Sequence, residues 1–132
     1  NDIILINGDT YFPLNVESFM NFHQVKQSDL SVALFSSENI KRFKKISINK
    51  NCEIINRLSS DKTFFVNAGT YMFNLKIIDY LKSNFHVTFS SLENDILPKL
   101  FSNFNSYGFH SSCKFIDIGL PEDYLHAHKY FQ

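Results

Sequence analysis

Apolar residues in this chain form short continuous runs that alternate with stripes at helical spacing. The runs predict strands at residues 3–6, 30–35, 43–48, 52–56, 63–66, 71–73, 107–109 and 114–118. The stripes predict helices at residues 16–26, 75–82, 90–101 and 122–130, the third with Pro98 as a kink in its interior. Because strands and helices alternate without repeats or linkers, we expect one α/β domain with a mixed, mostly parallel sheet.

The first run, residues 3–6, has four apolar residues in succession, which is typical of a strand buried on both faces. A strand of that kind needs a neighbour on each side. A chain that enters such a strand at once, without an initial Met, is expected to lack a segment upstream.

The composition is that of a globular domain rather than a disordered chain. The 132 residues are 44% apolar and include 15 Phe, so the chain is long enough to bury a core. Basic and acidic residues balance at 13 each, which argues against a nucleic-acid partner. The densest positive segment contains Lys41, Arg42, Lys44 and Lys45, which form either a solvated face or a rim that attracts phosphate.

Cys52 and Cys113 stand far apart in the sequence, as ordinary thiols of a reducing compartment do. No apolar run approaches the roughly 18 residues of a membrane span, so we expect no membrane partner and a cytoplasmic location. The five histidines lack metal-ligand spacing, and the sequence contains no Ser-His-Asp pattern or Gly-rich phosphate loop.

Two aspartates follow apolar runs at predicted strand ends, where α/β domains bind ligands. Asp9 follows Asn7-Gly8, which is also a strong hairpin signal, although Pro13 and the helical pattern after it argue against a partner strand. Asp117 interrupts an apolar strand, and its alternative role is a turn or a helix cap. Together the two carboxylates would suit Mg²⁺, which takes one or two carboxylates plus substrate phosphates.

Two further segments have both a structural and a functional interpretation. Ser90 and Glu93 have the spacing of a capping box, in which the acid reaches back to the backbone of the cap residue. Asn67-Ala68-Gly69 interrupts a strand, which predicts either a bulge or a close approach of a ligand to the backbone.

Three segments in this order resemble the sugar-phosphate nucleotidyltransferase family: residues 5–12 (LINGDTYF), residues 67–71 with 91–98 (NAGTY, SLENDILP), and residues 115–124 (FIDIGLPEDY). The resemblance covers the whole chain and is greatest to the mannose-1-phosphate and D-glycero-α-D-manno-heptose-1-phosphate guanylyltransferase branch. It implies a Rossmann-like nucleotide-diphospho-sugar transferase fold. It also implies that Asp9 and Asp117 bind the catalytic Mg²⁺, that Asn67 and Gly69 line the sugar pocket, and that Glu93 bonds to sugar hydroxyls.

The implied reaction is attack of a sugar 1-phosphate on the α-phosphate of an NTP, GTP in the branch of greatest resemblance, with release of pyrophosphate. The implied partners are the sugar 1-phosphate, such as a manno-heptose or mannose 1-phosphate, and the NTP, without nucleic acid or membrane. A homo-oligomer is compatible with the resemblance, and the implied process is nucleotide-sugar supply for capsule or lipopolysaccharide.

The sequence departs from the family at several positions. The Gly-rich N-terminal signature is missing, so residues 1–132 are expected to be the C-terminal sugar- and metal-binding part, inactive alone. Phe43-Lys44 replaces Tyr-Gly, and Leu120 replaces a commoner Thr. Arg57-Leu58-Ser59 replaces Glu-Lys-Pro, which removes a phosphate-binding Lys for which Arg57 or Lys62 would have to compensate.

These departures leave two alternatives open. One is a degenerate, non-catalytic homologue that binds a sugar phosphate or regulates another protein. The other is a small α/β interaction domain. A metal site requires the Asp9 and Asp117 carboxylates to lie within a few Å of one shared point.

Overall fold

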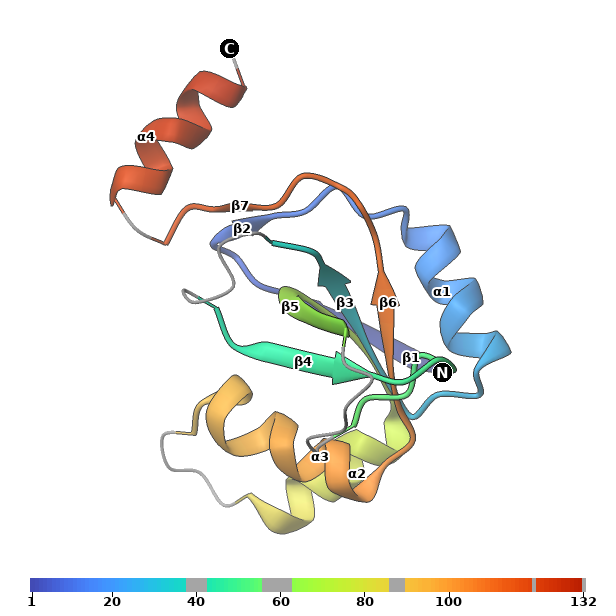
Figure 1. The fold of residues 1–132 in the computed structure, drawn as a ribbon. Coiled ribbons are helices and arrows are strands. Elements are labelled where there is room, and N and C mark those ends of the chain that lie inside the picture. Colours follow the sequence, from blue (N-terminus) through green and yellow to red (C-terminus); the bar gives the residue numbers. More distant parts are fainter. Residues whose placement is uncertain (38–42, 56–62, 86–89, 120, 132) are drawn as a thin grey trace.

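The computed structural model describes residues 1–37, 43–55, 63–85, 90–119 and 121–131 (Figure 1). The strands are β1 (Asp2–Ile6), β2 (Thr10–Tyr11), β3 (Leu30–Phe35), β4 (Lys45–Ile48), β5 (Thr63–Asn74), β6 (Ser106–His110) and β7 (Ile116–Asp117). The helices are α1 (Val16–Val25), α2 (Leu75–Asn84), the π-helical turn η2 (Leu92–Ile96), α3 (Leu97–Asn103) and α4 (Pro121–Tyr130). None of the helices in the described ranges is both long and apolar enough to cross a membrane.

The long strand β5 organises the main sheet, whose order is β1-β5-β3-β6 with β4 also paired to β5. β3 lies along one edge of β5, while β1 and β4 lie one after the other along the opposite edge. The predicted mixed sheet of an α/β domain is therefore confirmed. Its parallel pair in the described residues is β3 with β6, and the three pairs that involve β5 are antiparallel, so parallel pairing is less extensive here than the sequence suggested.

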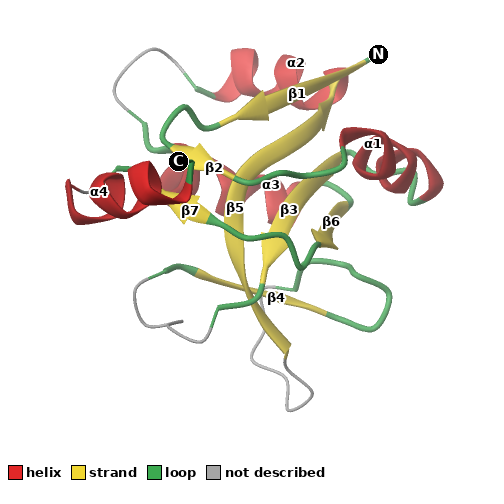
Figure 2. Cartoon of the chain, turned by 90° about the horizontal axis from the view of Figure 1, so that it is seen from above, coloured by secondary structure: helices red, strands yellow, loops and turns green. Residues whose placement is uncertain are grey.

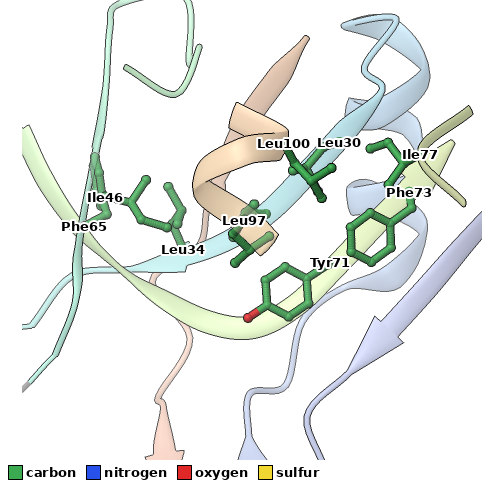
Figure 3. Packing of buried hydrophobic residues seen from close by; sticks show 10 residues of the cluster. Leu30, Leu34, Ile46, Phe65, Tyr71, Phe73, Ile77, Leu97 and Leu100 are labelled. Carbon is green, nitrogen blue, oxygen red and sulfur yellow. The ribbon is translucent and has the colours of Figure 1, made fainter. Parts of the chain in front are cut away.

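Helices cover both faces of this sheet (Figure 2). Alternate residues of β3 face opposite sides, and the whole strand is buried. Leu30, Val32 and Leu34 pack with residues of α2, α3 and β5. Figure 3 shows Leu30 and Leu34 in this cluster. Ala33 and Phe35 pack on the other face with a cluster that includes Phe19 of α1. The continuous apolar run at residues 30–35 thus reflects a strand between two layers of side chains.

The other continuous run, β1, has a different environment from the one predicted. Its one strand neighbour in the described part of the chain is β5, and Leu5 and Ile6 are 40% and 60% exposed. The expectation of burial on both faces is wrong for these residues. An apolar run indicates the kind of element, but which edge of a sheet it occupies depends on long-range pairing.

The predicted hairpin after β4 is present: Ile48 bridges to Ile54, and the Ile55 N–H donates to the Ser47 carbonyl over 2.9 Å. Pro98, predicted as a kink inside one helix, lies in the first turn of α3, directly after the π-helical turn η2. Proline cannot donate a backbone hydrogen bond, and the chain accommodates it by widening the preceding turn into η2, where the Leu97 N–H reaches back to the Leu92 carbonyl.

One buried histidine links α1 to the sheet. His23 is 2% exposed, and its Nδ1 lies 2.8 Å from the Ser31 hydroxyl oxygen of β3. Burial lowers the pKa of His23 from 6.5, and the charges of Asp2 and Asp29 only partly oppose this shift. The folded protein therefore favours neutral imidazole.

This burial predicts a pH-dependent stability. The unfolded chain binds a proton at His23 as the pH falls below 6.5 and the folded chain resists it, so stability is complete above that pH and is lost below it. Between pH 6.5 and 5, His23 should make the free energy of unfolding of the full-length protein fall with pH by up to about 1.4 kcal/mol per pH unit. We expect this contribution to the slope to be absent in the His23→Gln variant. Urea unfolding at several pH values measures it, and identical slopes for wild type and variant would contradict it.

Candidate active site at the broken edge of strand β5

The site lies along one edge of β5, between the stretches that pair with β1 and with β4 in the described part of the chain. Along this edge β1 pairs with Thr70–Asn74, and β4 pairs with Thr63–Val66. On the opposite edge, Val32 pairs with Tyr71 but Leu34 pairs with Asn67, so β5 contains extra residues at this point. The predicted interruption at Asn67-Ala68-Gly69 is therefore a bulge, and it coincides with the gap between β1 and β4.

Gly69 is required by the shape of this bulge. Its φ is +72°, a left-handed conformation that favours glycine. Its carbonyl accepts a 2.8 Å hydrogen bond from the Asn7 N–H, which ties the end of β1 to the bulge. A Cβ on Gly69 would lie 2.8 Å from Asn7 Nδ2, so neither the backbone nor the available space suits another residue.

Asp9 and Asp117 are brought together by the small β2–β7 ladder. Thr10 pairs with Asp117, and the Ile118 N–H donates to the Asp9 carbonyl over 2.9 Å. Asp9 Oδ2 and Asp117 Oδ1 lie 3.4 and 3.1 Å from the point that a Cβ of Gly119 would occupy. The two carboxylates therefore share one small space, which the missing side chain of Gly119 leaves open.

The sequence also allowed a purely structural role for each aspartate, a hairpin at Asp9 and a turn or helix cap at Asp117. A hairpin at Asp9 is wrong, because β1 pairs with β5 and β2 with β7. A turn at Asp117 is confirmed, since its Oδ1 accepts a 2.9 Å hydrogen bond from the Gly119 N–H. That bond fixes the direction of the carboxylate, so it is compatible with a binding role.

A cluster of phenylalanines packs between the chain segments that carry the site residues. Phe35 and Phe115 stack with ring centroids 4.1 Å apart, and the ring of Phe43 meets that of Phe115 edge-on at 5.8 Å. Phe12 packs beside both Phe35 and Phe115. Phe12 follows β2, Phe35 is the last residue of β3, and Phe43 and Phe115 precede β4 and β7. Their packing therefore holds the four chain segments around the site in one arrangement.

Glu93 faces the bulge and does not cap its helix. The cap is Ser91, whose Oγ accepts from the Asn94 N–H and whose own N–H donates to Asp95 Oδ2 over 2.7 Å. The capping box between Ser90 and Glu93 is therefore wrong by one residue. Glu93 Oε1 instead accepts a 3.2 Å hydrogen bond from Nδ2 of Asn67, a residue of β5.

Tyr71 completes this group and was missed as a site residue. Its ring is buried, and its hydroxyl accepts a 2.7 Å hydrogen bond from Asn67 Nδ2 and lies 3.4 Å from Glu93 Oε1. Burial, with help from the Glu93 charge, raises the pKa of Tyr71 to about 12. The phenol thus stays protonated and can orient the two polar side chains. Its place in the apolar alternation of β5 offered no signal beyond a core role.

All five predicted site residues line one cavity of about 190 Å³, together with Lys44. They are Asp9, Asn67, Gly69, Glu93 and Asp117. The sequence places Lys44 in a basic segment that is either a solvated face or a rim that attracts phosphate, and at a departure from the family. Lys41 and Arg42 of that segment lie outside the described residues. Arg57, Leu58, Ser59, Lys62 and Leu120 also lie outside them.

The donor set of this cavity fits a magnesium ion bound with substrate. Mg²⁺ commonly uses one or two protein carboxylates and completes its shell with phosphate oxygens and water. Asp9 and Asp117 supply two, and the described residues contain no group of three or more His, Cys, Asp or Glu that would form a closed metal cage.

Comparison with known proteins identifies relatives of the whole chain. The family model described as Nucleotidyl transferase matches residues 1–132. D-glycero-alpha-D-manno-heptose 1-phosphate guanylyltransferase of Aneurinibacillus thermoaerophilus is 31% identical over 137 residues, which cover 99% of this chain and 56% of that protein. The putative mannose-1-phosphate guanyltransferase of Sulfolobus acidocaldarius is 23% identical and covers 95% of this chain and 34% of its own length.

A solved structure agrees with the sequence comparison. The crystal structure of HddC from Yersinia pseudotuberculosis complexed with GMP-PN has a TM-score of 0.77 and 30% identity, over 99% of this chain and 56% of that one. The chain thus spans a little over half the length of the heptose-phosphate relative and of HddC.

The bulge gives a stability prediction with an internal control. We expect Gly69→Ala to lower the free energy of unfolding of the full-length protein by about 1–3 kcal/mol, because the residue combines a positive φ with a contact at Asn7. Gly8→Ala, where a Cβ would meet nothing within 4 Å, should change it far less. Denaturant unfolding compares the two, and equal effects would show that the bulge does not require glycine.

Proposed function

This chain belongs to the nucleotidyl transferase family, and on that premise we propose that the full-length protein is a sugar-1-phosphate nucleotidyltransferase. The observation that carries the proposal is the convergence of Asp9, Asp117, Asn67 and Glu93 on one cavity. These residues come from four separate segments of the chain, so their meeting is a property of the fold and not of a local motif.

In this proposal, the sugar binds at the bulge of β5. Glu93 presents carboxylate oxygens as acceptors to sugar hydroxyls. Asn67 Nδ2, whose second N–H reaches Glu93 Oε1 over 3.2 Å, can donate that N–H to a sugar hydroxyl in exchange. The buried Tyr71 hydroxyl keeps Asn67 in place from one side, and the Gly69 N–H donates to Asn67 Oδ1 over 3.0 Å from the other. A site whose polar groups are fixed before binding loses less entropy when the sugar arrives.

Asp9 and Asp117 would hold the magnesium ion in the space beside Gly119. When bound there, Mg²⁺ supplies positive charge that offsets the charge of the reacting phosphates. The two aspartates act as ligands in this scheme and not as proton acceptors, because a phosphate oxygen that is already ionised needs no base.

The reaction that fits these roles is a displacement at phosphorus. An oxygen of the sugar 1-phosphate forms a bond to the α-phosphorus of the NTP, the bond from that phosphorus to the bridging oxygen breaks, and pyrophosphate leaves with the electron pair. The residues of this chain orient the sugar and its phosphate for that attack. We expect the nucleotide to be bound largely by other parts of the full-length protein.

The names of the relatives favour GTP as the nucleotide and a heptose or mannose 1-phosphate as the acceptor. The relative of 31% identity is named for D-glycero-alpha-D-manno-heptose 1-phosphate, and that of 23% identity for mannose 1-phosphate. We propose the heptose 1-phosphate as the first substrate to test and mannose 1-phosphate as the second.

Loss of either metal-binding carboxylate tests the proposal. In full-length protein with GTP, Mg²⁺ and the heptose 1-phosphate, we expect Asp9→Asn and Asp117→Asn each to reduce kcat/KM by roughly 100-fold or more. The double variant should be little worse than either single one, because both remove the same ion. Asp79→Asn, an exposed carboxylate on α2, is the matched control and should retain activity.

Pyrophosphate release measures these rates across a panel of NTPs and sugar 1-phosphates. Unchanged activity in both variants would exclude the metal assignment. A wild-type protein that is stabilised against heat by sugar 1-phosphates but releases no pyrophosphate with any pair would instead be a non-catalytic binding homologue.

A further inference from the structure

We propose that Lys44 binds the phosphate group of the sugar 1-phosphate, an inference that rests on the proposed function of the same site. Lys44 directly precedes β4 and lies beside the gap in the edge of β5. It lines both the 190 Å³ site cavity and an adjoining cavity of about 270 Å³. The second cavity shares Asn67 and Glu93 with the first and has apolar walls that include Leu97 and Phe101.

The charge of the site requires a cation near the substrate phosphate. Three carboxylates line the site cavity, namely Asp9, Glu93 and Asp117. A dianionic phosphate would be repelled by them, and the metal position beside Gly119 offsets only the two aspartates. Among the described residues that line this cavity, Lys44 is the one cationic side chain.

The ammonium group of Lys44 is held at the site by two hydrogen bonds. It donates to the Glu93 carbonyl over 2.8 Å and to Asn94 Oδ1 over 3.2 Å, although these residues are about 50 positions away in the sequence. Both acceptors belong to η2, whose Glu93 also lines the site cavity. Within the part of the chain that the structure describes, no acceptor takes the third N–H, so the group can donate it to a phosphate oxygen.

The neighbours of Lys44 also fix its place. Phe43, which precedes Lys44, packs edge-on against Phe35 and Phe115. Phe115 lies two positions before Asp117 in the sequence. The Lys44 backbone is thereby anchored to the segment that carries one of the metal ligands. A lysine anchored in this way spends less conformational entropy on phosphate binding than a freely moving surface lysine.

A purely structural role makes a different prediction. If Lys44 only pins η2 to β4, its loss lowers the thermal stability and disturbs binding of both substrates. If it binds the sugar phosphate, its loss raises the KM for the sugar 1-phosphate and leaves the KM for the NTP unchanged.

The test compares Lys44→Met, Lys44→Arg and the control Lys50→Met in the full-length protein. Lys50 is an exposed lysine in the turn after β4 and lines none of the described cavities around the site. We expect Lys44→Met to raise the KM for the heptose 1-phosphate by roughly 10- to 100-fold, the usual effect of losing a charge-assisted hydrogen bond. Lys44→Arg should restore part of the loss, and Lys50→Met should match wild type.

Calorimetric titration of heptose 1-phosphate and of mannose 1-phosphate, without NTP, separates this inference from the proposed function. If the wild type binds a sugar 1-phosphate but releases no pyrophosphate, the proposed function fails, and weaker binding by Lys44→Met still supports the role of Lys44. Equal affinity of wild type and Lys44→Met overturns that role. So does a parallel rise of both KM values together with a lower Tm, and so does a wild type that binds neither sugar phosphate.

Discussion

The arrangement of the site depends on one interruption in the pairing of β5. A twelve-residue strand would ordinarily be paired along both edges, but here β1 covers one half of an edge and β4 the other. The bulge at Gly69 keeps the intervening backbone from continuing the ladder, and its carbonyl is satisfied by Asn7 instead. Asn67 is thereby turned toward Glu93, and the ends of β1 and β4 deliver Asp9 and Lys44 to the same opening.

The rest of the molecule serves to keep that opening in shape. The α2–α3 face of the sheet is filled by an apolar cluster that includes the ring of Tyr71 (Figure 3). This packing fixes the position of the Tyr71 hydroxyl beside Asn67 and Glu93. On the other face, the phenylalanine cluster binds β7 to the sheet and positions Asp117. The high Phe content of the sequence thus has a specific use, because stacked rings hold short and irregular segments that lack long hydrogen-bonded ladders.

Local patterns in the sequence predicted the elements well and their partners poorly. The helices α1, α2 and α4, the strand β3 and the bulge at Asn67 are encoded by periodicity and by turn residues close in sequence. The exposed edge of β1 and the extent of antiparallel pairing depend on contacts between distant segments, which periodicity does not record. The same holds for the site. Its two aspartates stood out as charged residues after apolar runs, whereas Tyr71 looked like core. Lys44 was one residue of a basic segment that is either a solvated face or a rim for phosphate. Tyr71 and Lys44 both have their role through Glu93 and its neighbours, more than twenty positions away.

The central claim is that Asp9 and Asp117 form one divalent-cation site beside the sugar-binding bulge. A crystal structure of the full-length protein soaked with Mn²⁺ and a sugar 1-phosphate tests it most directly, because the anomalous signal of manganese locates the ion independently of the protein model. The account predicts one peak that an oxygen of each aspartate ligates at a distance close to the 2.0–2.1 Å typical of Mg²⁺, with the sugar ring against Asn67 and Glu93. An ion bound elsewhere, or a sugar phosphate that lies outside this cavity, would contradict it.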